Sequence, residues 1–398
     1  MKKFLSYVTA FSLALSVYGG FAREGSAETN EVEQNETKET ATKLSFSTSS
    51  DENFPYETFG NGSFEQKEDV DFYQFSLEKD GGINVSLSQL KTANFGIELY
   101  NTKDEVLQSW EVSEGEETID VFYEGLPAGK YYIKLWVKSG TVAATSNSYS
   151  MKILYSNEDY LEKETNNTLQ TATSMTLNKN YIGFTDSESD DFYKIKTTSN
   201  GKLTIKGSYS ENVELSYVLL DAKGKLIEDW TINPNEENEI TDIFTVGVAK
   251  GTYYLVVTHD YKDEYANEAY ITQAKFTADN YSEKESNETS ATATPVLLKQ
   301  KYNAILSWKT DVDTFKLNMT ATGNVTLNMS QAPKTTFKVV VVNSKNKVIK
   351  TFYTKVGKGS NVTIGTVNLP KGTYFIKVQY NKGDYYQVPY KLNLQPKK

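Results

Sequence analysis

The stretch EKESNET, from Glu283 to Thr289, determines how the whole chain is organised. Nearly the same residues occur twice before it, as EVEQNET from Glu31 and as EKETNNT from Glu162. The shared pattern is Glu-x-Glu-x-Asn-x-Thr, and its copies start at residues 31, 162 and 283. Because these intervals match the size of an ordinary domain, the sequence predicts three copies of one domain-sized unit.

Further landmarks follow each copy of the motif in the same order. An acidic-aromatic segment comes first, as DVDFYQF, DDFYKI and DVDTFKL, and a tyrosine-led run closes each copy, as YSMKIL, YITQAKF and YKLNL. Between them lie short alternating apolar runs, separated by Gly, Asn and Asp turns. The chain also has 28 Tyr and 19 Phe but only 8 Pro and no Cys, a composition that favours strands. We therefore predict an all-β fold of three tandem antiparallel β-sandwiches, arranged like beads on a string, each with its own core.

The N-terminus, MKKFLSYVTAFSLALSVYGGFA, has the features of a secretory signal peptide: two lysines, an apolar run and then small residues. Cleavage after Ala22 and cleavage after Ala27 both suit the pattern. The alternative is a membrane anchor, but the apolar run is short for a bilayer span and no second one follows, so we expect no membrane span after cleavage. The predicted boundaries are therefore 1–27 for the signal peptide and 28–156, 157–279 and 280–398 for the three sandwiches. We expect a secreted protein, extracellular or associated with the cell wall, without disulfides.

The repeated acidic motif predicts a site for a hard cation. In an extended segment Glu283, Glu285 and Asn287 face the same way, and two carboxylates on one edge repel each other unless a cation lies between them. Asp311 and Asp313 supply two more carboxylates at the same spacing. Calcium takes six to eight oxygen ligands, whereas zinc prefers Cys and His, of which the chain has none and one. The alternative is that these residues form solvated acidic turns, with Asn-x-Thr starting a helical turn.

Taken together, these motifs resemble the bacterial pre-peptidase C-terminal domain, a family that includes the collagen-binding modules of clostridial collagenases. The resemblance covers essentially the whole chain after the leader, as three tandem copies. It implies a jelly-roll-like β-sandwich with up to one structural calcium ion per domain. Carried over to this sequence, the implied ligands in the first and third copies are Glu31, Glu33, Asn35, Asp69 and Asp71, and Glu283, Glu285, Asn287, Asp311 and Asp313.

The middle copy departs from this pattern. Ser189 stands where the first and third copies have an aspartate, and Asp190 lies directly next to Asp191. Asp186 or Asp190 is expected to compensate. The candidate ligands of the middle copy are therefore Glu162, Glu164, Asn166, Asp186, Asp190 and Asp191.

The sequence predicts a binding protein and not an enzyme. The one histidine, His259, and the absence of cysteine exclude the usual Ser-His-Asp, Cys-His and His-rich zinc arrangements within one chain. The leading hypothesis is a calcium-binding protein that attaches to an extracellular polymer or protein, either collagen-like protein or a cell-wall polymer. The alternative is an accessory, regulatory or targeting partner of a secreted peptidase. Nucleic acid is not an expected partner, because the exported chain is acidic overall.

Charge is distributed unevenly among the copies. Residues 30–156 contain 10 basic and 22 acidic residues, and residues 157–280 contain 11 and 22, whereas residues 281–398 contain 18 and 6. The last copy thus has a net charge of +12. It is expected either to bind an anionic surface or to pack against the acidic copies. Trp136 and Trp308, which have no aromatic counterpart in the other copies, are candidates for exposed contacts.

Overall fold

The structure is a computed structural model. It describes residues 28–51, 54–115, 117–142, 147–157, 159–184, 190–208, 214–233, 240–259, 269–331, 333–357 and 359–397. The predicted signal peptide and Asp186 lie outside these residues. The described part of the chain is all-β and contains no helix, so the predicted fold class is confirmed. It accordingly has no helical segment with the length and apolar character needed to cross a membrane.

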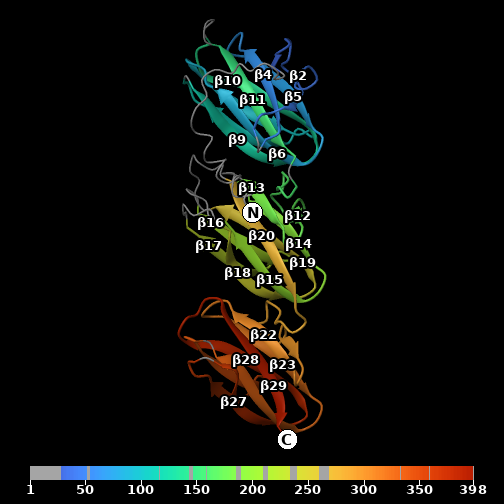
Figure 1. Cartoon of the computed structure of the whole chain (residues 1–398), viewed down its shortest axis with the longest axis vertical. Helices are drawn as coiled ribbons and strands as arrows, with labels where there is room; N and C mark the ends of the chain where they lie inside the picture. Colours follow the sequence, from blue (N-terminus) through green and yellow to red (C-terminus); the bar gives the residue numbers. More distant parts are fainter. Residues whose placement is uncertain are drawn as a thin grey trace.

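The first group of strands, here called unit one, forms two sheets that enclose one core (Figure 1). One sheet has the order β1-β4-β11-β6-β9, with β3 on the side of β4, and the other has the order β2-β5-β10-β7-β8. The strands are β1 (Glu28–Asn30), β2 (Thr42–Lys43), β3 (Ser47–Thr48), β4 (Tyr56–Ser63), β5 (Val70–Leu77), β6 (Gly81–Ser88), β7 (Ala93–Tyr100), β8 (Val106–Val112), β9 (Thr118–Leu126), β10 (Gly129–Gly140) and β11 (Ser148–Ser156).

Unit two repeats this arrangement in the orders β12-β14-β19-β16-β17 and β13-β20-β15-β18. Its strands are β12 (Thr173–Met175), β13 (Asn180–Phe184), β14 (Asp191–Thr197), β15 (Gly201–Gly207), β16 (Leu215–Asp221), β17 (Leu226–Ile232), β18 (Thr241–Val248), β19 (Gly251–His259) and β20 (Ala269–Ala278).

Unit three repeats it again in the orders β21-β23-β28-β25-β26 and β22-β29-β24-β27. Its strands are β21 (Thr294–Val296), β22 (Lys301–Leu306), β23 (Val312–Met319), β24 (Gly323–Gln331), β25 (Thr336–Asn343), β26 (Val348–Tyr353), β27 (Gly359–Leu369), β28 (Gly372–Lys382) and β29 (Val388–Lys397).

The strands follow from the alternation in the sequence. In β15, Leu203 and Ile205 are fully buried, while Thr204 between them and the lysines on either side point away from the core. The pairing is antiparallel apart from a short parallel strand in each five-stranded sheet and the parallel pair β1–β4. Each unit has a separate apolar cluster, as the repeat predicted.

The units pack end to end more closely than beads on a string (Figure 1). The main-chain N–H of Glu164 donates to the carbonyl oxygen of Gly125 in unit one, and that of Glu285 donates to Gly247 in unit two, each at 2.9 Å. A Cβ on Gly125 or Gly247 would lie 2.5 or 2.2 Å from the carbonyl oxygen of the following unit's first Glu, so only glycine permits this approach. Sheet register places Asn368 of unit three at the equivalent position.

Aromatic side chains close the junction between units two and three. The Trp230 ring stacks on Tyr386 with ring centroids 4.1 Å apart, and it lies 5.1 Å from Trp308. Trp308 also donates its indole N–H to Glu228 at 2.7 Å. Trp308 was expected to make exposed contacts, but it packs within the chain, because the preceding unit covers it. Trp136 is half-buried and packs beside Gly96.

Candidate metal centre

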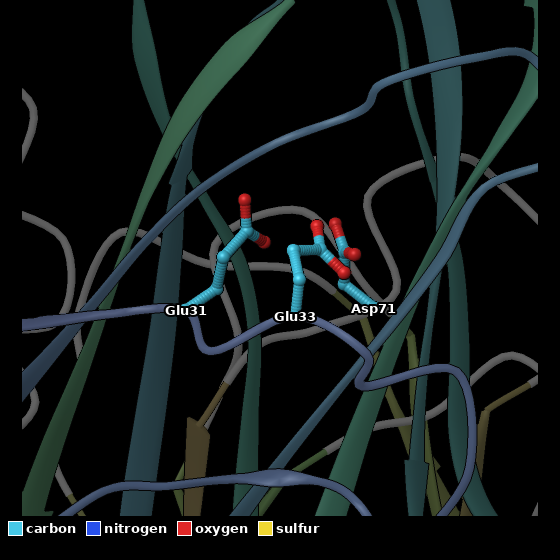
Figure 2. Close-up of side chains that lie close together, drawn as sticks. All are labelled: Glu31, Glu33 and Asp71. Carbon is cyan, nitrogen blue, oxygen red and sulfur yellow. The ribbon is translucent and has the colours of Figure 1, made fainter.

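Three carboxylates of unit one point toward one another at the start of the sandwich (Figure 2). Glu31 and Glu33 come from the segment after β1, and Asp71 comes from β5. One carboxylate oxygen from each lies within 4.8 Å of the others. The two-residue spacing of the glutamates therefore puts both on one side of the segment, and β5 supplies the third carboxylate.

Hydrogen bonds orient two of these carboxylates and leave oxygens free. The main-chain N–H of Ser63 donates to Glu31 Oε1 at 2.7 Å, and the Tyr149 hydroxyl donates to Asp71 Oδ2 at 2.6 Å. Asp71 Oδ1 has no hydrogen-bond partner although the residue is 0% exposed. The side-chain amide of Asn35, also 0% exposed, has no partner either. Buried polar atoms of this kind normally have partners, so they indicate a ligand between them.

Unit three builds the same arrangement from Glu283, Glu285 and Asp313, whose oxygens also lie within 4.8 Å of one another. The N–H of Ile305 donates to Glu283 Oε1 at 2.5 Å, and the Tyr390 hydroxyl donates to Asp313 Oδ2 at 2.6 Å. The other oxygen of Glu283 and the other oxygen of Asp313 are buried and receive no hydrogen bond from a donor group, and the two carboxyl groups lie within hydrogen-bond reach of each other. These free oxygens repeat the observation made in unit one.

The remaining predicted ligands of units one and three have other partners. Asp69 accepts the N–H of Glu65 at 2.7 Å and does not belong to the carboxylate group. Asp311 likewise accepts the N–H of Ser307 at 2.8 Å and stands outside its group. Asp69 therefore orders the turn before β5, which carries Asp71, and Asp311 orders the turn before β23, which carries Asp313. Asn287 is 0% exposed, and it accepts from the N–H of Thr314 at 2.8 Å and donates to Glu285 at 3.1 Å.

The middle group includes a residue that sequence reasoning missed. Glu162 and Glu164 lie with Glu124, which is supplied by β9 of unit one. Asp190 is exposed and does not belong to this group, and Asp186 lies outside the described residues. The departure at Ser189 is thus accompanied by a carboxylate from the preceding unit, which no pattern within the middle copy signals.

The other two middle residues lie beside this group. Asp191 is buried and accepts the Tyr270 hydroxyl at 2.5 Å. Turning the Asn166 side-chain amide so that its nitrogen faces the acids lets it donate to Glu164 at 3.0 Å and to Asp191 at 3.3 Å. All three copies of the motif therefore gather acidic side chains at the start of their sandwich.

Burial and mutual repulsion make these acids hard to ionise in the absence of a cation. Burial, opposed by the Tyr149 hydrogen bond and assisted by the Glu31 charge, raises the pKa of Asp71 to about 8. Burial and the neighbouring Asp313 charge raise the pKa of Glu283 well above its usual value, and burial with the Asp191 charge does the same to the pKa of Glu162. A bound cation would reverse both effects, because it replaces lost hydration and offsets the repulsion.

Sequence reasoning also missed the tyrosines that orient Asp71, Asp191 and Asp313. They lead the closing strands β11, β20 and β29, and they are Tyr149, Tyr270 and Tyr390. The sequence contained the signal, since each copy closes on a tyrosine-led run, but buried packing alone accounts for such a position equally well. The hydroxyl hydrogen bond distinguishes the two roles.

Unit three differs from unit two at two neighbouring core positions, and the two differences compensate in volume. In unit two Gly183 faces Tyr193, and a Cβ there would lie 2.5 Å from the Tyr193 hydroxyl. Sheet register places Ala304 and Phe315 at these two positions in unit three. The alanine methyl group therefore occupies space that becomes available when the hydroxyl is lost.

A pocket of about 400 Å³ opens beside the acidic group of unit three. Its lining includes Glu283, Asn303 and Tyr390 from unit three, and Lys202 and Gly247 from unit two. The pocket gives solvent a path to Glu283 from the junction between the two units.

Comparison with known families assigns part of the chain. Residues 69–135 match the family described as the bacterial pre-peptidase C-terminal domain. This match lies within unit one, from the start of β5 into β10. Residues 321–388, in unit three, match the secretion system C-terminal sorting domain, which indicates a secreted protein. No curated protein matches the chain.

Solved structures similar to the chain include the pre-peptidase C-terminal domain of a collagenase from Bacillus anthracis. It is 15% identical, with 26% of this chain and 94% of that chain covered and a TM-score of 0.22. The CUB1-EGF-CUB2 region of human MASP-1/3 is 8% identical, with coverages of 54% and 99% and a TM-score of 0.18. The corresponding region of rat MASP-1 is 9% identical, with coverages of 55% and 99% and a TM-score of 0.17.

Proposed function

We propose that the chain is a secreted, non-catalytic calcium-binding protein built from three tandem units of the pre-peptidase C-terminal type. The observation that carries the metal proposal is the set of buried oxygens that receive no hydrogen bond from a donor group, on Asp71, Glu283 and Asp313, each directed into a carboxylate group. Only oxygen ligands are present, which suits a hard cation. Because the ligands are mostly carboxylates and an amide, calcium is the ion we assign, with up to one per unit.

Calcium would act structurally in this protein by joining the acidic segment to the sandwich. In unit three, Glu283 and Glu285 belong to the segment that enters the sandwich, and Asp313 belongs to β23. The N–H of Glu285 also bonds to Gly247 of unit two. An ion held by these residues would fix the segment and, through it, the angle between successive units. For the middle copy we propose a centre formed by Glu162, Glu164 and Glu124, in which Glu124 is supplied by unit one.

We propose attachment to an extracellular polymer or protein as the biological role. The relation of unit one to a domain found in a collagenase favours a collagen-like protein, whereas the basic unit three favours an anionic cell-wall polymer. Tandem units held at fixed angles would combine weak contacts into firm attachment. The second candidate, an accessory or targeting partner of a secreted peptidase, is favoured by the same family match and would show as a stable complex with such a peptidase.

Co-sedimentation of the mature chain tests this role. The chain is expected to pellet with insoluble collagen or with purified cell wall. It should do so more strongly in calcium than in chelator if the fixed angles between units matter. Cellulose serves as an uncharged control polymer. A chain that stays in the supernatant with both collagen and wall would contradict the attachment proposal.

The raised pKa of Asp71 predicts a pH dependence that calcium removes. Its pKa rises from 3.8 to about 8 on folding, mainly through burial, so the metal-free native state holds the extra proton between these values. Stability of the metal-free protein is therefore expected to fall as pH rises through this window. Calcium binds the deprotonated form, so the calcium-loaded protein should not lose stability this way. Urea unfolding at pH 5 and pH 8 measures both, and Asp71→Asn should reduce the metal-free dependence to the share that comes from the buried acids of the other units.

A further inference from the structure

The outer face of the five-stranded sheet in unit three differs in charge from the same face in units one and two. Register places Lys316, Lys377 and Lys338 on this face, on β23, β28 and β25. The same positions are Gln74, Lys134 and Gly96 in unit one, and Lys194, Val256 and Ser216 in unit two. Only unit three therefore carries all three cations.

The three lysines form a diagonal row across the sheet. Lys316 pairs with Phe375, which is two residues from Lys377, and Lys377 pairs with Val340, which is two residues from Lys338. Diagonal neighbours on one sheet face lie about 7–8 Å apart. Tyr353 of β26 follows in the same cross-strand row as Lys338. The lysines are half-buried and Tyr353 is 57% exposed, so apolar stems and a ring support the charged ends.

Unit three also lacks the carboxylates that neutralise this face in unit one. There Lys134 pairs with Glu98 at 3.4 Å, and Glu111 lies on the edge strand β8. Register replaces Glu98 by Val340 and Glu111 by Tyr353. The sequence has no acidic residue between Asp313 and Asp384, and none of the described ion pairs involves unit three. The face therefore presents uncompensated positive charge.

The regular spacing favours a linear polymer with a repeating negative charge. Lysine ammonium groups bind phosphates as point charges, and a glycerol linker between successive phosphates spans a distance similar to that between these lysines. An acidic peptide suits this face less well. Its main-chain N–H groups would find no partners across the face of a sheet, where the main chain is already paired.

We propose that the diagonal lysine row Lys316–Lys377–Lys338, ending at Tyr353, is a binding surface for a linear phosphodiester polymer of the poly(glycerol phosphate) kind. This inference deepens the proposed attachment to an extracellular polymer and rests on it. It assigns the wall-directed contact to one sheet face of unit three. Units one and two, with acidic surfaces, do not share this contact.

Binding of the mature, calcium-loaded chain to synthetic poly(glycerol phosphate) tests the proposal by titration calorimetry. The variant Lys316→Gln/Lys338→Gln/Lys377→Gln is expected to bind about 100-fold more weakly, given the usual contribution of each lysine near a polyanion. The matched control is Lys301→Gln/Lys371→Gln/Lys397→Gln, which removes the same charge from exposed sites in unit three, away from the row. This control should retain nearly full affinity. Unchanged melting temperatures in calcium show that both variants fold.

Three results would overturn the proposal. They are no binding of the wild-type chain, equal loss in both variants, and equal affinity for poly-glutamate, which would make an acidic polypeptide the ligand class. Pelleting with collagen and with whole wall, measured on the same preparation, separates the two levels of the argument. Wild-type pelleting with collagen or wall but no binding to the polymer removes the lysine row and keeps the attachment role. Absence of pelleting with both removes the attachment role itself.

Discussion

The midpoint of thermal unfolding of the mature chain is expected to rise by about 10 °C when chelator is replaced by millimolar calcium. The reason is the cost of the metal-free state. Asp313 and Glu283 of unit three are buried side by side, each with an oxygen that receives no hydrogen bond from a donor group. An ion that binds only the folded state at about 100 times its Kd adds about 2.7 kcal/mol. Differential scanning calorimetry in calcium and in chelator measures the shift.

The variant Glu283→Gln gives this prediction a sharper form. The amide keeps an acceptor for the N–H of Ile305, and it removes one of two repelling charges. In chelator the variant should be at least as stable as the wild type, while the calcium shift of unit three should disappear. Asp384→Asn, which removes an exposed carboxylate of the same unit, is the control and should keep the full shift. An identical calcium shift in Glu283→Gln and wild type would contradict a calcium site at this position.

Replacing Gly247 by alanine is expected to disrupt the junction between units two and three. The new Cβ would lie 2.2 Å from the main-chain oxygen of Glu283 and 2.8 Å from its carbonyl carbon, so the backbone must move. Overpacking of this kind costs about 1–3 kcal/mol. The hydrogen bond from the N–H of Glu285 to Gly247 would lengthen as well. We therefore expect weaker calcium binding by unit three, measured by calorimetry, and a wider range of interunit angles in X-ray scattering.

Gly323→Ala is the matched control for this substitution. It also lies in a strand of a four-stranded sheet, but the closest atom to its new Cβ is the end of Met319 at 3.9 Å. This variant should keep the calcium affinity and scattering profile of the wild type. If Gly247→Ala also kept the wild-type calcium affinity and scattering profile, the close approach between units would not contribute to calcium binding or to the interunit angle.

Sequence reasoning reached the fold because the repeat and the two-residue alternation are local signals. The sequence alone placed Glu283, Glu285 and Asp313 as neighbours, since strand geometry sets which side chains share a side and the three copies fix the correspondence. It also assigned Asp69 and Asp311 to the ligand sets, and this stays a prediction, because in the structure their carboxylates lie outside the two groups and accept main-chain N–H groups of a turn. Spacing cannot separate these roles, because both need an acidic residue at the same place.

Contacts between units were beyond the reach of the repeat pattern. Glu124 joins Glu162 and Glu164 across a junction, and nothing in its own copy signals this. Trp308 was predicted to be exposed because it lacks a counterpart, yet its position at the start of unit three brings it onto Trp230. A repeat pattern reveals only the features that the copies share. The junction depends on side chains that differ from copy to copy.

Unit three has Asn368 at the position where units one and two have the junction glycines Gly125 and Gly247, so the ends of the three units differ. A duplicated unit two could follow itself, because Gly247 leaves room for the main chain of the next acidic segment. A unit placed after unit three would meet the Cβ of Asn368 at that point. Gly125 and Gly247 leave room for a following acidic segment, whereas a unit joined after unit three would need Asn368→Gly to approach as closely.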